Sequence, residues 1–315
     1  MIESLSFALS ITGPIFIIIT LGCWLKRIGL ISYEFINTAS SLVFKVCLPT
    51  LLFLSIQNAA MPTEESVPTI VIAFLSTLVI FFVSWLISPL IVSEPRDRGV
   101  FVQGSFRSNL GVIGLAFSAK AYGDEGLALA SMMMAFVTVL YNILSVTALT
   151  STLQPGREHR LRPIFVGIFS NPLIIAIVLS FALKLLNVGL PAVLQDTGEY
   201  FASMTLPLAL LCIGATFSFQ SLRRASKIAA WASLMKLLVM PLLCLAIATA
   251  FGIRGMPLGV LFLMVSAPTA AASYVMVEAM KGNSELAANI VAMSTLWSII
   301  TVSTGLFFLK SLELI

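Results

Sequence analysis

The chain has 315 residues, of which 59% are hydrophobic and only 10% are charged. Soluble domains carry charges on about a quarter of their residues, so this composition excludes a soluble enzyme and predicts an all-α polytopic membrane protein. The net charge of +4 comes with no run of Lys and Arg interleaved with aromatic residues, so nucleic acid is not expected as a partner.

Ten apolar stretches are each long enough to cross about 30 Å of hydrocarbon as a helix, which takes about 20 residues. The lipid bilayer is therefore the first predicted partner. The first stretch follows Glu3 rather than a basic leader and lacks a small-residue cleavage site, so we expect it to remain as a span. In chain order, the predicted spans cover residues 7–25, 36–56, 67–91, 100–119, 126–150, 163–187, 200–219, 229–251, 257–280 and 286–309.

The second half of the chain repeats features of the first half at a nearly constant offset. Each half holds five predicted spans, and because five is odd, the second half must enter the membrane from the opposite side. We therefore predict two inverted five-helix repeats, residues 1–155 and 156–315. Such repeats are typical of secondary transporters, which bind substrate near the midplane on interrupted helices. The matching pairs, 158 residues apart, are Pro14 and Pro172, Lys26 and Lys184, and Leu48-Pro49 and Leu206-Pro207.

The basic residues are distributed unevenly between the two sides of the predicted membrane. With the N-terminus outside, alternate loops place eleven of the 18 Lys and Arg residues in the cytoplasm and four on the other side. Cytoplasmic loops carry an excess of Lys and Arg, so we predict a multi-pass protein of the plasma (inner) membrane with both termini outside the cytoplasm. The segment 151–162 joins the repeats and holds the only histidine, His159, which is expected to be a solvated loop residue.

The fourth and ninth spans carry matching interruptions. The fourth combines Ser108 and Asn109 with Gly111, and a glycine weakens a helix by about 1 kcal/mol relative to Ala. The ninth contains Pro268 followed by Thr269, and proline breaks the helical ladder at a cost of about 3 kcal/mol. Paired, interrupted spans are the best sequence indication of a transporter's site, so we predict that these five residues line it. The alternative is close packing at the glycine and a simple kink at the proline.

Five further polar side chains fall within spans, where such groups are costly and usually retained for function. Lys45, one helical turn before a proline, would either neutralise a substrate anion or bond to carbonyls that the proline frees. Asn142 is expected either to contact substrate through its amide or to support a residue that does. Lys236 is expected in a structural role, within reach of the cytoplasmic interface. Arg107 and Glu278 are expected toward the cytoplasmic side, as charge pairs or interface anchors.

Catalysis is not expected from this sequence. It has no His-Glu-x-x-His pattern, no Ser/His pair within a span and no phosphate-binding glycine loop with Lys. The four cysteines lie inside apolar spans with no metal-site spacing, so neither a metal nor a cofactor is predicted. No Asp or Glu lies at a span centre, which disfavours a sodium or proton relay built on carboxylates. Coupling to protons or sodium could instead use Lys45, Glu278, backbone carbonyls or the proton of the substrate.

Four motifs are spread over essentially the whole chain. They are RSNLGVIG (107–114) with AYGDEGLA (121–128), NPLII (171–175), LPLAL (206–210) with IGA (213–215), and APTAAA (267–272). In this order they resemble the motifs of the auxin efflux carrier family in its compact bacterial type.

The resemblance implies ten helices in two inverted repeats, with helices 4 and 9 broken and crossing at the substrate site. It implies that Asn109 contacts substrate and that a bundle containing the crossing moves against a scaffold of other spans. Members of the family carry carboxylates such as malonate or auxin, and the plant exporters are dimers, so a homodimer is a further expectation. The plant proteins also pair an Asp with a Lys on the second span, where this chain has Lys45 without the Asp.

We therefore predict a secondary transporter of small organic anions, carboxylates such as malonate or auxin-like acids, that works by alternating access. Ser108, Asn109 and Thr269 would donate hydrogen bonds, and the N-termini of the half-helices would favour a carboxylate. The alternative class is a non-transporting membrane receptor or scaffold on a transporter fold, which would bind ligand without net flux. A channel is disfavoured because no repeated charged filter is present.

Overall fold

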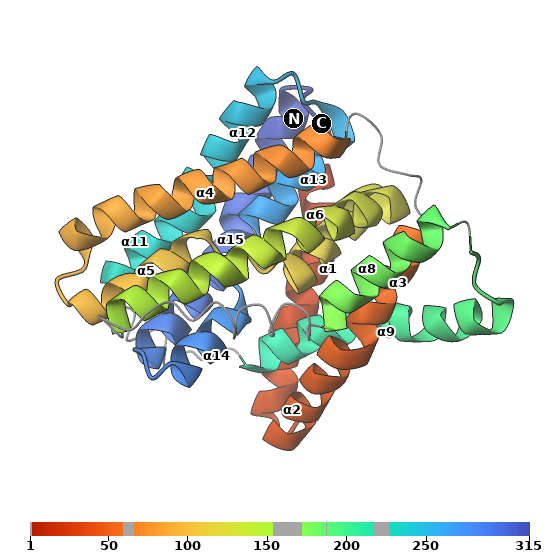
Figure 1. Ribbon diagram of the computed structural model, residues 1–315, viewed down its shortest axis with the longest axis horizontal. Helices are drawn as coiled ribbons and strands as arrows, with labels where there is room; N and C mark the ends of the chain where they lie inside the picture. The colour runs from red at the N-terminus through yellow and green to blue at the C-terminus, as the bar shows by residue number, and fades with distance from the viewer. Residues whose placement is uncertain (1, 59–65, 154–171, 187, 217–226) are drawn as a thin grey trace.

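The computed structural model describes residues 2–58, 66–153, 172–186, 188–216 and 227–315 (Figure 1). Over these residues every named element is a helix, and the β pairing is limited to one isolated bridge. The predicted all-helical class is therefore confirmed. The junction of the proposed repeats at residues 155 and 156, together with His159 and the start of the sixth predicted span, lies outside the described residues.

The first three predicted spans are helical. The second contains a wide π-helical turn just before Pro49, whose ring would otherwise clash with the carbonyl of Lys45 one turn earlier. The elements are α1 (Ile2–Arg27), then α2 (Tyr33–Leu42), η1 (Val43–Cys47) and α3 (Leu48–Asn58), and then α4 (Ser66–Ile91).

The fourth and fifth predicted spans form α5 (Pro95–Phe106), the π-helical turn η2 (Leu110–Gly114) and α6 (Leu115–Leu153). The long helix α6 is interrupted at Gly123, whose φ of +60° and ψ of −145° are not helical. A positive φ of this kind is available to glycine without strain. The chain folds back there, so the two sides of Gly123 are separate helical segments, as the spans ending at 119 and beginning at 126 predicted.

The helices in the second half of the chain are interrupted in the same ways. Its ninth predicted span is divided between α13 and α14, and its eighth contains another π-helical turn before a proline. The elements are α8 (Pro172–Leu185), α9 (Ala192–Thr216), α11 (Lys227–Leu234), η3 (Met235–Val239), α12 (Met240–Ala250), α13 (Gly255–Ser266), α14 (Ala271–Ala279) and α15 (Ser284–Ser311).

In the described part of the chain, seven helical segments are long and apolar enough to cross a membrane by themselves. The sequence predicted ten spans, and the difference lies in the interrupted ones. One segment, Leu110–Leu153, joins half of the fourth span to the fifth, and the remaining apolar helices, Pro172–Leu185 and Gly255–Ser266, are shorter. The structure supports a multi-pass membrane protein, while the ten-span repeat remains a prediction.

The helices pack into two groups (Figure 1). One group contains α1, α2, α3, α8 and α9, and the other contains α4, α5, α6 and α11 to α15. In the first group, a methyl group at Gly214 of α9 would overlap the Ile19 carbonyl, so glycine permits the close approach of α9 to α1. Contacts of α1 with α15 and of α3 with α6 join the groups.

The surface and the chain ends both suit a membrane protein. Large apolar side chains are exposed around the molecule, for example Leu86 and Leu90 on α4, which are 74% and 86% exposed. Such residues are stable in contact with lipid and would be costly in water. Helices α1 and α15 pack together, and the Lys310 ammonium lies 5.2 Å from the centre of the Phe7 ring. The two termini therefore lie at the same end of the molecule (Figure 1).

Candidate functional site

The fourth and ninth spans are interrupted where the sequence predicted. Helix α5 ends at Phe106 and η2 begins at Leu110, while α13 ends at Ser266 and α14 begins at Ala271. The two extended segments between these ends, residues 107–109 and 267–270, meet in an antiparallel pair that we call the crossing.

Backbone hydrogen bonds hold the crossing together. The Asn109 N–H donates to the Pro268 carbonyl at 2.7 Å, and the Ala270 N–H donates to the Arg107 carbonyl at 3.0 Å. Inside a bilayer, backbone groups that leave a helix cannot be satisfied by lipid. Each break therefore supplies the backbone partners that the other break needs.

Two hydroxyl groups complete this exchange. Ser108 Oγ donates to the carbonyl of Val265 at 3.2 Å, near the end of α13. Thr269 Oγ1 donates to the carbonyl of Gly104 at 2.8 Å, near the end of α5. The last carbonyls of a helix have no partner within the helix, so each hydroxyl satisfies the end of the opposite helix. Both of these predicted site residues are buried, and in this conformation both hydroxyls are engaged with the protein.

Lys236 lies at the crossing, although it was expected within reach of the cytoplasmic interface. It lies on η3 with no exposed surface, and its ammonium group donates to the same Val265 carbonyl that accepts from Ser108. A cation is favoured at the C-terminal end of a helix, where unpaired carbonyls carry partial negative charge. The interface expectation was therefore wrong, and the structural role fits the position.

Asn109, in the crossing, and Gly111, just after it on η2, have fewer contacts with the rest of the protein. Asn109 is half-buried at the start of η2, and its side-chain amide has no hydrogen bond to any described residue. Gly111 is also half-buried, and a methyl group added there would find its nearest neighbours, on Leu48 and Met134, at 3.5 Å. Close packing therefore does not account for this glycine.

Arg107 is more deeply placed than expected. It follows the twelve-residue helix α5, about 18 Å from the start of that helix, and only 9% of it is exposed, which does not suit an interface anchor. Its guanidinium donates to Ser145 Oγ at 2.9 Å and to Asn142 Oδ1 at 3.0 Å, both on α6. Glu278, which was expected to pair with charge or anchor an interface, is exposed on α14.

The remaining two predicted site residues have different positions. Asn142 is half-buried and is joined to the crossing through Arg107. Lys45 is exposed on η1, one turn before Leu48, and makes no hydrogen bond to the described residues of the crossing. Contact between Lys45 and substrate stays a prediction.

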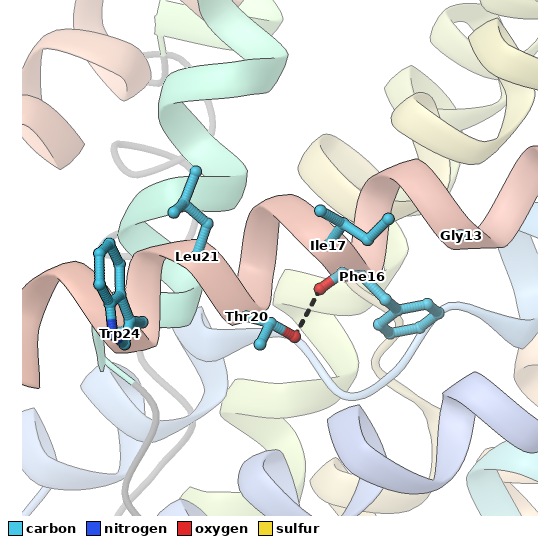
Figure 2. A pocket seen from close by; sticks show the side chains of 6 residues that line it. All are labelled: Gly13, Phe16, Ile17, Thr20, Leu21 and Trp24. Carbon is cyan, nitrogen blue, oxygen red and sulfur yellow. Dashed lines mark hydrogen bonds between the residues drawn. The ribbon is translucent and has the colours of Figure 1, made fainter.

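A hollow on the molecular surface lies away from the crossing. It has a volume of about 530 Å³ and follows one face of α1 (Figure 2). Apolar side chains line most of it, and the hydroxyl of Thr20 is bound to the Phe16 carbonyl at 2.8 Å. It offers nothing that would recognise an anion, and Ile17 and Trp24 within it are exposed as lipid-facing residues are. Among the described residues, no three metal-ligating side chains come together either.

Comparisons with known proteins cover nearly the whole chain. Residues 11–304 match the family described as membrane transport protein. An uncharacterized transporter of Methanothermobacter thermautotrophicus is 25% identical over 296 residues, which cover 91% of this chain and 94% of the relative. One of Methanocaldococcus jannaschii is 22% identical over 302 residues, covering 92% and 94%. The uncharacterized transporter YfdV of Escherichia coli is 23% identical over 275 residues, covering 84% and 86%.

Proposed function

The chain belongs to the membrane transport protein family, that of the auxin efflux carriers, and we propose that it is a secondary transporter of small organic anions. The substrates in this proposal are carboxylates such as malonate or auxin-like acids. They bind at the crossing and are carried by alternating access, as is typical of transporters with interrupted helices.

The observation that carries the proposal is the unengaged amide of Asn109 beside the paired breaks. An amide group supplies hydrogen-bond donors for a carboxylate. The nearby N-termini of η2 and α14 have no side-chain cap, and helix N-termini carry partial positive charge that favours anions. Gly111 keeps the approach to this amide free of side-chain bulk.

The proposed topology is ten spans in two inverted repeats, residues 1–155 and 156–315, with both termini outside the cytoplasm. The hydroxyl of Ser108 donates to the end of α13, and the hydroxyl of Thr269 donates to the end of α5. Two related repeats would produce such a reciprocal pair of hydrogen bonds, so the pair supports this topology. Termini at the same end of the molecule support an even number of crossings. The excess of basic residues in alternate loops supports the orientation and a plasma-membrane location.

The proposed transport movement uses the two helix groups. The group with α5, α6, α13 and α14 contains both halves of the crossing, so it moves as one body against the group with α1, α3, α8 and α9. Coupling to a proton or a sodium gradient, and assembly as a homodimer, stay open within this proposal.

Flux through reconstituted protein tests the proposal. Labelled malonate and labelled indole-acetate are offered to proteoliposomes under imposed proton or sodium gradients. We expect gradient-dependent uptake by the wild type, loss of uptake in Asn109→Ala, and retention in Asn37→Ala, which removes an exposed amide on α2. Correctly inserted Asn109→Ala protein with unimpaired flux would remove the site assignment. Binding without flux by the wild type would favour a receptor instead.

A further inference from the structure

Arg107 is a buried cation whose recorded partners are all neutral. Its side chain is 9% exposed, and its guanidinium contacts Ser145, Asn142 and, at 3.7 Å, the sulfur of Met276. Among the described residues no Asp or Glu pairs with it. A buried charge without an opposite charge is costly, because neutral hydrogen bonds replace only part of its hydration.

Some guanidinium donors of Arg107 remain unused. Nη1 donates to Ser145 and Met276, and Nη2 donates once, to Asn142. The Nε–H and one Nη2–H have no acceptor among the described residues. A planar guanidinium with two free donors is able to bind a carboxylate.

Further polar groups around Met276 also lack partners. Gln103, one turn before Arg107 on α5, is 1% exposed, and its amide nitrogen contacts the Met276 sulfur at 3.1 Å while its Oε1 is unsatisfied. Ser273, in the first turn of α14, is 3% exposed and its hydroxyl is also unsatisfied. Buried polar atoms are rarely left without hydrogen bonds, so each of these two indicates a missing partner.

From these observations we infer that Arg107 binds a carboxylate group of the transported anion, between α5, α6 and α14. Asn142 and Ser145 orient the guanidinium, and Gln103 and Ser273 contribute polar contacts to the rest of the anion. This inference rests on the proposed function, since it names the charged group that would recognise the substrate. It adds a residue on the side of the crossing that faces α14, whereas Asn109 lies at the start of η2.

The second buried cation, Lys236, does not meet the same conditions. Its ammonium group is bound to the Val265 carbonyl at the end of α13, where the helix itself supplies compensating negative charge. Arg107 is the C-cap residue of α5, but its guanidinium is directed to side chains of α6 and not to the carbonyls at that helix end. Of these two buried cations, Arg107 is therefore the one that an outside anion would compensate.

Thermal unfolding of purified protein without ligand separates a ligand-binding role from a structural one. We expect Arg107→Gln to melt at the same temperature as the wild type or higher, because the substitution removes an uncompensated buried charge. Arg254→Gln, which changes an exposed arginine, is the matched control. A melting temperature several degrees below that of the control, or failure of both Arg107→Gln and Arg107→Lys to fold, would show that Arg107 is structural and overturn the inference.

The second arm adds malonate or indole-acetate, with sodium chloride at equal ionic strength as the blank. We expect either carboxylate to stabilise the wild type, and the half-saturating concentration to rise about tenfold or more in Arg107→Gln. Arg107→Lys keeps the charge but not the planar guanidinium, so its half-saturating concentration should lie between those of the wild type and Arg107→Gln.

The variants also separate this inference from the proposed function. Stabilisation of Arg107→Gln equal to that of the wild type, with stabilisation lost in Asn109→Ala, would overturn the role of Arg107 and leave the proposed function standing. No stabilisation of the wild type by either acid would count against the proposed substrate class. In that case the ligand-free melting comparison still decides whether Arg107 is structural.

Discussion

The two halves of the crossing satisfy their helix ends in different ways. At the end of α13, the Val265 carbonyl accepts from both Ser108 and the buried ammonium of Lys236. At the end of α5, the Gly104 carbonyl has Thr269 as its recorded side-chain donor. The end of α13 therefore has a charged side-chain donor from a neighbouring helix in addition to a hydroxyl, whereas the side-chain donor at the end of α5 is one neutral hydroxyl.

The two breaks also differ in the groups that they offer to a ligand. The first break is residues 107–109 and the second is residues 267–270. The first break presents the amide of Asn109 and the cation of Arg107, and neither has all of its donors used by described residues. The second break carries no charged side chain of its own between Ala267 and Ala270. We conclude that the second break stabilises the crossing, and that the first break supplies the groups proposed to bind substrate.

The largest loss of stability is expected at the charge that closes the second break. Lys236→Met removes a charge-assisted hydrogen bond from a buried helix end, and should lower the free energy of unfolding by about 1–3 kcal/mol. Thermal unfolding in detergent measures this change, with Lys120→Met, at an exposed lysine, as the control. Equal stability of the two variants would contradict the role given to Lys236.

Thr269→Ala should have the next largest effect, because the buried Gly104 carbonyl then loses its side-chain donor. We expect a loss of about 1–2 kcal/mol, in the range found for hydrogen bonds between helices in membranes and for unsatisfied buried groups. Thr269→Ser keeps the hydroxyl and should unfold close to the wild-type temperature. If serine and alanine are equally destabilising, the methyl group rather than the hydroxyl matters.

Ser108→Ala should cost less than Thr269→Ala, about 0.5–1 kcal/mol, because Lys236 still donates to the Val265 carbonyl. Measured side by side, these two alanine variants rank the two helix ends directly. The reverse order would show that the two breaks do not differ as described.

Gly111→Ala should change stability least. Its added methyl group meets only ordinary contacts at 3.5 Å, so the free energy of unfolding should stay within about 0.5 kcal/mol of the wild type. Gly114→Ala is the control, because its methyl group would lie 2.8 Å from the sulfur of Met264, which must move. Reduced malonate flux in a stable Gly111→Ala protein would support a ligand near that residue, and normal flux would remove Gly111 from the site.

The positions of the breaks could be predicted from the sequence because helix interruption is a local property. Pro268 removes a backbone donor, and the run from Asn109 to Gly111 weakens a helix, whatever surrounds them. Reciprocal pairing of Ser108 with Val265 and of Thr269 with Gly104 could not be predicted, since it depends on how α5 and α13 approach each other.

The charged residues were harder to place because their roles depend on tertiary packing. Lys45 and Lys236 both lie in π-helical turns shortly before a proline, yet Lys45 is exposed and Lys236 is at the crossing. Only the neighbours of each turn distinguish them. Arg107 was expected toward the cytoplasmic side from the direction of its span, which was predicted to begin at residue 100. Helix α5 begins at Pro95, so Arg107 lies more than one turn further from the start of its helix.

Counterflow of malonate is the decisive measurement for alternating access, because it requires a carrier that presents one site to each side in turn. Proteoliposomes loaded with unlabelled malonate are diluted into labelled malonate, with no ion gradient imposed. We predict transient accumulation of label by the wild type and by Asn37→Ala, and none by correctly inserted Asn109→Ala. Counterflow by Asn109→Ala at the wild-type rate, or malonate binding by the wild type without counterflow, would contradict it.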